Sequence, residues 1–128
     1  MKHFIFLFLS ATSLSAQHLD GEAFQAQTEG QTIYFYDLQM GVVAEQYLPN
    51  RQVLWSVGPG MCLEGSWYDD GQNICFEYVG RPDPICWTTS LDQGRILVEL
   101  VGGDSSDNQF EVMRTDEPLD CPQILLGV

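Results

Sequence analysis

The segment EGSWYDDGQNICFEYVGRPDPICW, residues 64–87, carries the most specific structural signal in this chain. Asp70-Gly71 and Gly80-Arg81 are turn-forming pairs, and the runs around them are rich in aromatic and β-branched residues. Runs of this composition separated by short turns are typical of antiparallel hairpins. We therefore expect two consecutive β-hairpins that share their middle strand.

The two expected turns also predict which residues face each other. A two-residue turn at Asp70-Gly71 sets Trp67 opposite Ile74, and a turn at Gly80-Arg81 sets Trp87 opposite the same Ile74. Because side chains alternate between the faces of a strand, both hairpins then place their apolar residues on one face. The residues of this face are Leu63, Gly65, Trp67, Ile74, Phe76, Tyr78, Ile85 and Trp87. In this register Gly65 lies opposite Phe76 and leaves room for its ring.

The same register predicts how the four cysteines pair. Cys75 falls directly opposite Cys86, within the Cα separation of about 4.4–6.8 Å that a disulfide needs. Cys62 falls opposite Val79, about 13 Å along the strands from Cys75, which is too far for a bridge. We therefore predict the disulfides Cys75–Cys86 and Cys62–Cys121. The alternative is a zinc site, but the spacings contain no C-x-x-C, so we expect no metal and no cofactor.

Strand-like runs cover most of the rest of the chain, and short turn sequences separate them. They span residues 32–38, 41–48, 52–57, 62–68, 73–79, 85–90, 95–101 and 108–114. Short connections favour antiparallel neighbours, so we predict a mainly β fold, an up-and-down meander of about eight strands. The meander either closes into a small barrel or forms a strongly curved open sheet. Residues 19–30 predict a short N-terminal helix, with Asp20 as its N-cap and Gly30 at its end.

The N-terminus has the pattern of a secretory signal peptide. A short basic start precedes the apolar run FIFLFLSATSL, and Ser15-Ala16 resembles a cleavage site. We expect a signal peptide over residues 1–16 and one disulfide-stapled β domain over residues 17–128. Such a protein is exported to the periplasm or the extracellular space, where disulfides persist. No later segment is long and apolar enough to predict a membrane span.

The charge of the chain is strongly negative. The chain has eighteen acidic and five basic residues, and one of the five basic residues, Lys2, lies in the predicted signal peptide. This balance argues against nucleic acid and anionic lipid as partners, because both require a cationic surface. A basic envelope or extracellular protein fits the charge, and solubility alone is the simpler explanation.

Few residues form a recognisable chemical site. In the predicted register Glu64 lies opposite Glu77, so the two carboxylates either sit on a solvated face or work as an acid–base pair. Tyr68 in the same segment is a candidate binding residue, because an exposed aromatic ring can bind sugar or protein. Residues 102–111 are an oxygen-rich loop, for which an acidic turn is a better interpretation than a calcium site. No nucleophile–base arrangement is visible, so we predict no catalytic residues.

Four stretches, EQYLPNRQVLW, CLEGSWY, ICFEY and CW, resemble a group of small exported bacterial proteins without an assigned activity. The chain is also similar, more weakly, to periplasmic inhibitors of C-type lysozyme, which are small exported β-barrels with a serine- and tyrosine-containing loop. That similarity points to Ser66 and Tyr68. We expect a non-enzymatic binding or envelope-associated module, with an inhibitor of a basic hydrolase and a hydrolase using Glu64 and Glu77 as the alternatives.

Overall fold

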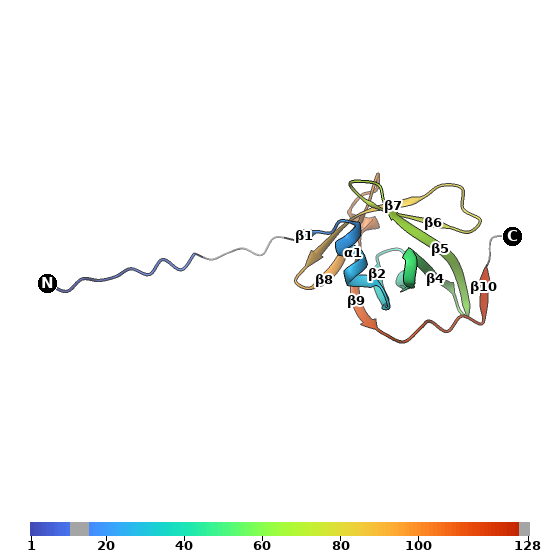
Figure 1. Ribbon diagram of the computed structural model, residues 1–128, viewed down its shortest axis with the longest axis horizontal. Coiled ribbons are helices and arrows are strands. Elements are labelled where there is room, and N and C mark those ends of the chain that lie inside the picture. Colours follow the sequence, from blue (N-terminus) through green and yellow to red (C-terminus); the bar gives the residue numbers. More distant parts are fainter. Residues whose placement is uncertain (11–15, 126–128) are drawn as a thin grey trace.

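The fold is a closed antiparallel barrel, seen in a computed structural model that describes residues 1–10 and 16–125 (Figure 1). Its eight strands pair in chain order, and pairing of the last strand with the first closes the barrel. The strands are β2 (Thr32–Asp37), β3 (Gly41–Tyr47), β4 (Gln52–Gly58), β5 (Met61–Asp69), β6 (Ile74–Tyr78), β7 (Ile85–Asp92), β8 (Arg95–Leu100) and β9 (Gln109–Thr115). The predicted meander is confirmed, and of its two forms the structure has the closed barrel.

Two short strands pair with inner strands of the meander. Strand β1 (Gln17–His18) pairs antiparallel with β7, and β10 (Gln123–Leu125) pairs in parallel with β5. Two 3-10 turns, η1 (Pro49–Arg51) and η2 (Ser105–Asp107), complete the elements. Residues 1–10 extend away from the barrel (Figure 1). Of the predicted signal peptide, residues 11–15 lie outside the described residues.

One α-helix is present among the described residues: α1 (Gly21–Thr28), about two turns long, lies across one end of the barrel. The predicted N-cap is confirmed, because the Asp20 carboxylate accepts the N–H of Ala23 at 2.8 Å. Phe24 is 1% exposed and meets the rings of Tyr47 and Trp67 edge-on, with centroids 5.7 and 5.0 Å away. The helix therefore closes this end with an aromatic plug. No helix among the described residues is long and apolar enough to cross a membrane.

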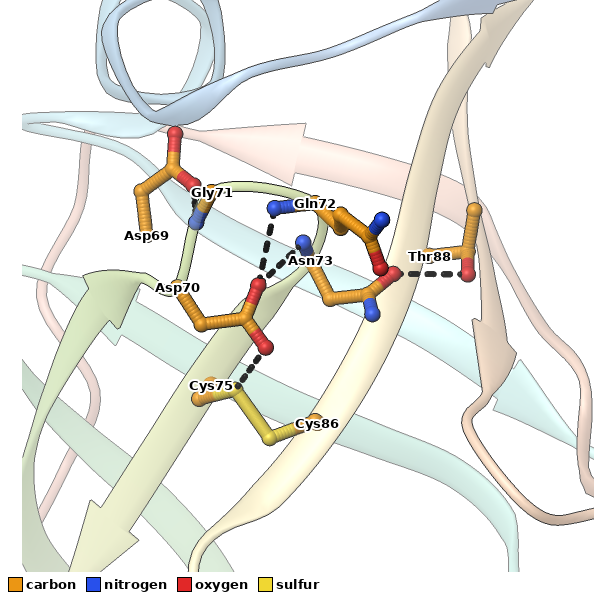
Figure 2. The surroundings of a disulfide bond; sticks show 8 residues. All are labelled: Asp69, Asp70, Gly71, Gln72, Asn73, Cys75, Cys86 and Thr88. Carbon is orange, nitrogen blue, oxygen red and sulfur yellow. Dashed lines mark hydrogen bonds between the residues drawn. A yellow bond between two sulfur atoms is a disulfide. The ribbon is translucent and has the colours of Figure 1, made fainter.

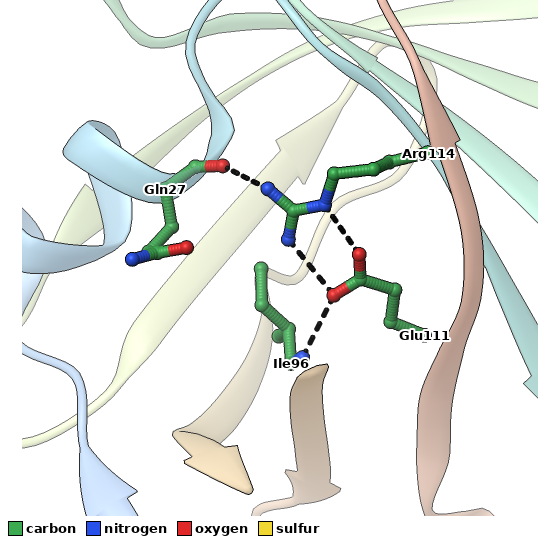
Figure 3. A network of polar contacts seen from close by, with 4 residues as sticks. All are labelled: Gln27, Ile96, Glu111 and Arg114. Atoms are coloured by element: carbon green, nitrogen blue, oxygen red, sulfur yellow. Dashed lines mark hydrogen bonds and ion pairs between the residues drawn. The ribbon is translucent and has the colours of Figure 1, made fainter. Parts of the chain in front are cut away.

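A polar cluster holds the helix on the barrel wall (Figure 3). Arg114 donates two hydrogen bonds to the Glu111 carboxylate and a third to the Gln27 carbonyl at 2.9 Å. The N–H of Ile96 donates to the same carboxylate at 2.9 Å, so Glu111 links β9 to β8. A bulge in the β2–β9 pairing accompanies this arrangement. Nothing in the strand alternation of the sequence predicted this cluster.

Both predicted disulfides are confirmed. Cys75 and Cys86 lie opposite each other on β6 and β7, with Cα atoms 4.0 Å apart. Cys62 and Cys121 have Cα atoms 5.6 Å apart, and this bridge fastens the C-terminal segment to β5 beside β10. The predicted register of the β6–β7 hairpin is also correct, since Ile74 pairs with Trp87.

The predicted two-residue turn at Asp70-Gly71 is wrong. The β5–β6 loop has four residues, 70–73, and Asp69 pairs with Ile74 while Trp67 pairs with Phe76. Figure 2 shows the reason: the Asp70 carboxylate accepts the N–H groups of Gln72 and Asn73, at 2.9 and 2.7 Å. Hydrogen bonds of this kind stabilise a four-residue loop, which is longer than the two-residue turn that Asp70-Gly71 alone would favour. The register moves by two residues, so the predicted apolar face is kept.

Candidate functional site

The shifted register separates the two glutamates that were expected to face each other. Glu77 pairs with Ser66, and Glu64 lies opposite Val79, whose N–H donates to the Glu64 carbonyl at 3.0 Å. The predicted Glu64–Glu77 opposition is therefore wrong, and an acid–base pair loses its geometric basis. Gly65 accordingly faces Tyr78 instead of Phe76.

Three of the four predicted binding residues still share one surface. Glu64, Ser66 and Glu77 line a shallow outer groove beside the 79–84 loop, together with Arg81 and Asp83. Tyr68 is not among the lining residues of this groove; its side chain is exposed on the outer face, at the level of Cys75. The sequence analysis thus named three residues of this groove without predicting the groove itself.

A second candidate site lies inside the barrel, at the end opposite the helix. A hollow of about 210 Å³ opens there. It is lined by Asp37, Met40, Trp55, Tyr78, Ile85, Trp87, Leu100, Asp107 and Gln109. A smaller hollow of about 50 Å³ lies deeper and is bounded by Phe24 of the plug and by Glu45. Tyr78, Trp87 and Gln109 line both hollows, so they form the boundary between them.

Glu45 is the most unusual residue of this interior. Strand β3 turns Val43, Glu45 and Tyr47 toward the axis, and Glu45 is only 7% exposed. The hydroxyl of Tyr78 donates to Oε1 of Glu45 at 2.8 Å. Burial raises the pKa of Glu45 to about 8, and the hydrogen bond from Tyr78 offsets only part of that effect. Burial and the neighbouring carboxylate also hold the pKa of Tyr78 well above 10.

Sequence reasoning missed Glu45, although a signal was present. In the run GVVAEQY, strict alternation puts Glu45 on the same face as Val43 and Tyr47. A charged residue in phase with apolar ones marks a buried polar position. Whether that position faces a packed core or a hollow depends on barrel closure, which the pattern does not reveal.

The rim of the open end is acidic, and its carboxylates accept hydrogen bonds from neighbouring groups. The Asp37 carboxylate accepts hydrogen bonds from the Gln109 side chain at 2.9 Å and from the N–H of Met40 at 2.8 Å. Burial alone would raise the pKa of Asp37, but these hydrogen bonds and one from the N–H of Gln39 leave it below its usual value. The Gln39 side chain donates to Asp107 at 3.0 Å, which ties the β2–β3 turn to η2.

Aromatic rings form one wall of the hollow. The ring centroids of Trp55 and Tyr78 are 5.0 Å apart, and Trp87 lines the same space. The Arg81 guanidinium lies 5.3 Å from the Trp55 ring centroid. Rings next to carboxylates suit a ligand that has both an apolar part and a positive or hydrogen-bonding group.

One group of possible metal ligands comes together among the described residues. Asp70, Cys75 and Cys86 come close together, but the two sulfur atoms are bonded to each other and offer no thiolate (Figure 2). In the 102–111 loop the Asp104 carboxylate accepts the N–H of Ser106 at 2.8 Å, and Asp107 accepts the N–H of Asp104 at 3.1 Å. These carboxylates stabilise an acidic turn.

Comparisons with protein-family models, with curated proteins and with solved structures find no match to this chain. The site itself must therefore indicate the function.

Proposed function

We propose that this protein is a non-enzymatic, exported binding protein that holds a small organic ligand in the open end of its acidic barrel. The observation that carries the proposal is the asymmetry of the interior. The helix end is filled by Phe24, whereas the other end keeps a hollow next to the buried Glu45–Tyr78 pair. Concave, largely apolar hollows with a few convergent polar groups are the usual form of small-molecule sites.

Ligand binding explains the buried Glu45 carboxylate better than a contribution to stability does. Placing Glu45 inside an apolar barrel without a cation costs free energy, because the ionised group loses its hydration. A hydrophobic residue at this position would pack more favourably. Groups with strongly shifted pKa values in a cavity are frequent at functional sites.

The lining supports binding without covalent chemistry. Among the described residues that line the two hollows there is no serine, threonine, cysteine or histidine. The polar groups are carboxylates, phenols, the Gln109 amide and the indole N–H groups of Trp55 and Trp87, and several of them are hydrogen-bonded to one another. Export is part of the proposal: the N-terminal sequence pattern and the two disulfides are compatible with it.

A ligand panel tests the proposal. Small aromatic amines, alcohols, carboxylates and monosaccharides are titrated into the purified protein, and tryptophan fluorescence reports on Trp55 and Trp87. We expect at least one class to bind at micromolar to low millimolar concentration. Leu100→Phe, which fills the hollow, should abolish that binding, whereas Val101→Phe on the adjacent outer face should not. If no class binds, or if Leu100→Phe binds as well as the wild type, the proposal fails.

A second candidate function, inhibition of a basic hydrolase such as lysozyme, is favoured by the outer groove. Glu64, Glu77 and Asp83 line that groove on a chain of net charge −13. Complementary charge predicts fast, salt-sensitive association. Lysozyme activity is measured at low salt with the wild type, with Glu64→Gln/Glu77→Gln and with the exposed control Glu99→Gln. Inhibition that is absent at micromolar protein, or unchanged in the double variant, would exclude this function for the groove.

A further inference from the structure

One carboxylate oxygen of Glu45, which lines the deeper hollow, has no hydrogen-bond donor among the described residues. Tyr78 satisfies Oε1 of Glu45, and no described residue donates to Oε2. No side-chain oxygen or nitrogen among the described residues is both fully buried and unpartnered. Oε2 therefore keeps some accessible surface, and the deeper hollow is the cavity that Glu45 lines. A group that enters this hollow meets a carboxylate oxygen with a free lone pair.

We propose that the ligand of the open barrel end is a protonated primary amine with a compact apolar body, whose ammonium group donates to Glu45. This inference rests on the proposed function and specifies its ligand class. In this arrangement the ammonium occupies the deeper hollow, and the apolar body lies between Trp87, Trp55 and Leu100 in the outer one.

Charge complementarity favours a cation over an anion or a neutral ligand. Asp37 and Asp107 line the rim, Glu45 lies below them, and no Lys or Arg is among the lining residues of either hollow. The guanidinium of Arg81 lies against Trp55, and Arg114 is paired with Glu111 near the helix. An ammonium ion gains from the carboxylate and from the faces of the aromatic rings. The net charge of −13 attracts cations from a distance.

The two volumes limit the size of the ligand. The deeper hollow, about 50 Å³, has room for a water or an ammonium group. The outer hollow, about 210 Å³, is below the usual range of roughly 300–1,000 Å³ for drug-sized ligands. A single ring joined to an amine by a short linker fits these limits, whereas a peptide or an oligosaccharide does not.

Proton exchange gives this ligand class a distinctive signature. At pH 7 the empty site holds a proton on Glu45, since its pKa is about 8. An ammonium beside the carboxylate favours the ionised form, so binding should release about one proton at pH 7. An alkylammonium keeps its own proton to about pH 10. Affinity should therefore rise by up to about tenfold per unit from pH 6 to pH 8 and then level off.

Other titratable or charged groups also face this interior. They are Asp37 on β2, Tyr47 on β3, Tyr78 on β6, Glu111 and Arg114 on β9, and Asp107 on η2. The pKa values of both tyrosines are raised well above 10 by burial. Hydrogen bonds leave the pKa values of Asp37 and Glu111 below their usual values, although burial opposes this. Arg114 stays protonated, because Glu111 raises its pKa further.

The test is calorimetric titration of the purified protein with 2-phenylethylamine and with 2-phenylethanol, which has the same ring and linker but no charge. We expect the amine to bind at least about tenfold more tightly than the alcohol, as a charge pair in a partly desolvated site requires. Titrations in buffers of different ionisation enthalpy should show the released proton. Glu45→Gln, which keeps an acceptor for Tyr78, should remove both the preference and the proton release.

The outcomes separate this inference from the proposed function. Equal binding of amine and alcohol, tighter binding at pH 6 than at pH 8, or an unchanged preference in Glu45→Gln would overturn the ligand class. In those cases loss of binding in Leu100→Phe would still support a ligand site in the barrel. If neither compound nor any other panel member binds, both proposals fall. The wild-type comparison alone decides the ligand class if Glu45→Gln does not fold.

Discussion

Replacing Glu45 with glutamine should stabilise the protein, by an amount that grows with pH. Glutamine has nearly the same volume, and its carbonyl oxygen can accept the hydrogen bond from Tyr78. It brings no charge into the barrel, whereas burial raises the pKa of Glu45 from 4.5 to about 8. The substitution therefore isolates the cost of ionising a carboxyl group at this position.

The size of the effect follows from proton linkage. Between pH 4.5 and about pH 8 the folded protein keeps a proton on Glu45 that the unfolded chain has lost. Because the unfolded state binds fewer protons in this window, wild-type stability falls as the pH rises, by about 1.4 kcal/mol per unit. The advantage of glutamine should be about 1 kcal/mol at pH 5, about 3 kcal/mol at pH 7 and about 5 kcal/mol at pH 9.

Urea denaturation followed by tryptophan fluorescence at pH 5, 7 and 9 measures these differences. Glu99→Gln is the matched control, since Glu99 is exposed on the outer face of β8 and should show no comparable trend. A difference between Glu45→Gln and the wild type that stays constant within about 1 kcal/mol from pH 5 to pH 9 would refute the reasoning. It would mean that Glu45 ionises in the barrel as readily as in water.

Three further substitutions test the fold. Phe24→Ala should lower the free energy of unfolding by about 3–5 kcal/mol, since the buried ring plugs the barrel; an effect below 1 kcal/mol in denaturant titrations would contradict the plug. Gly65→Ala should cost about 1–3 kcal/mol, because its Cβ would lie 2.6 Å from a tyrosine ring, whereas Gly58→Ala meets nothing within 4 Å and serves as the control. Cys121→Ser should leave Cys62 as the single free native thiol and lower the unfolding free energy by roughly 2–5 kcal/mol. Thiol titration and peptide mapping check this, and a second free thiol would be inconsistent with the pairing.

The sequence by itself determined the features that arise from neighbouring residues. Strand runs and turns follow from local composition, and the Asp20 N-cap follows from one side chain and the N–H groups after it. Cys75 and Cys86 could be paired because a short hairpin with a clear turn brings them opposite each other. The Cys62–Cys121 bridge then followed by exclusion, and it held although the neighbouring register was wrong.

Only the tertiary structure decided the β5–β6 register, the closure of the sheet and the nature of the interior. A two-residue shift keeps every side chain on its face, so an alternating pattern cannot distinguish the two registers, and the Asp69 and Asp70 carboxylates selected the longer loop. Closure depends on contact between β2 and β9, more than 70 residues apart in the chain. Glu45 became a buried site residue through that closure, because a carboxylate on an inward face is solvated in an open sheet and loses its water only when the barrel surrounds it.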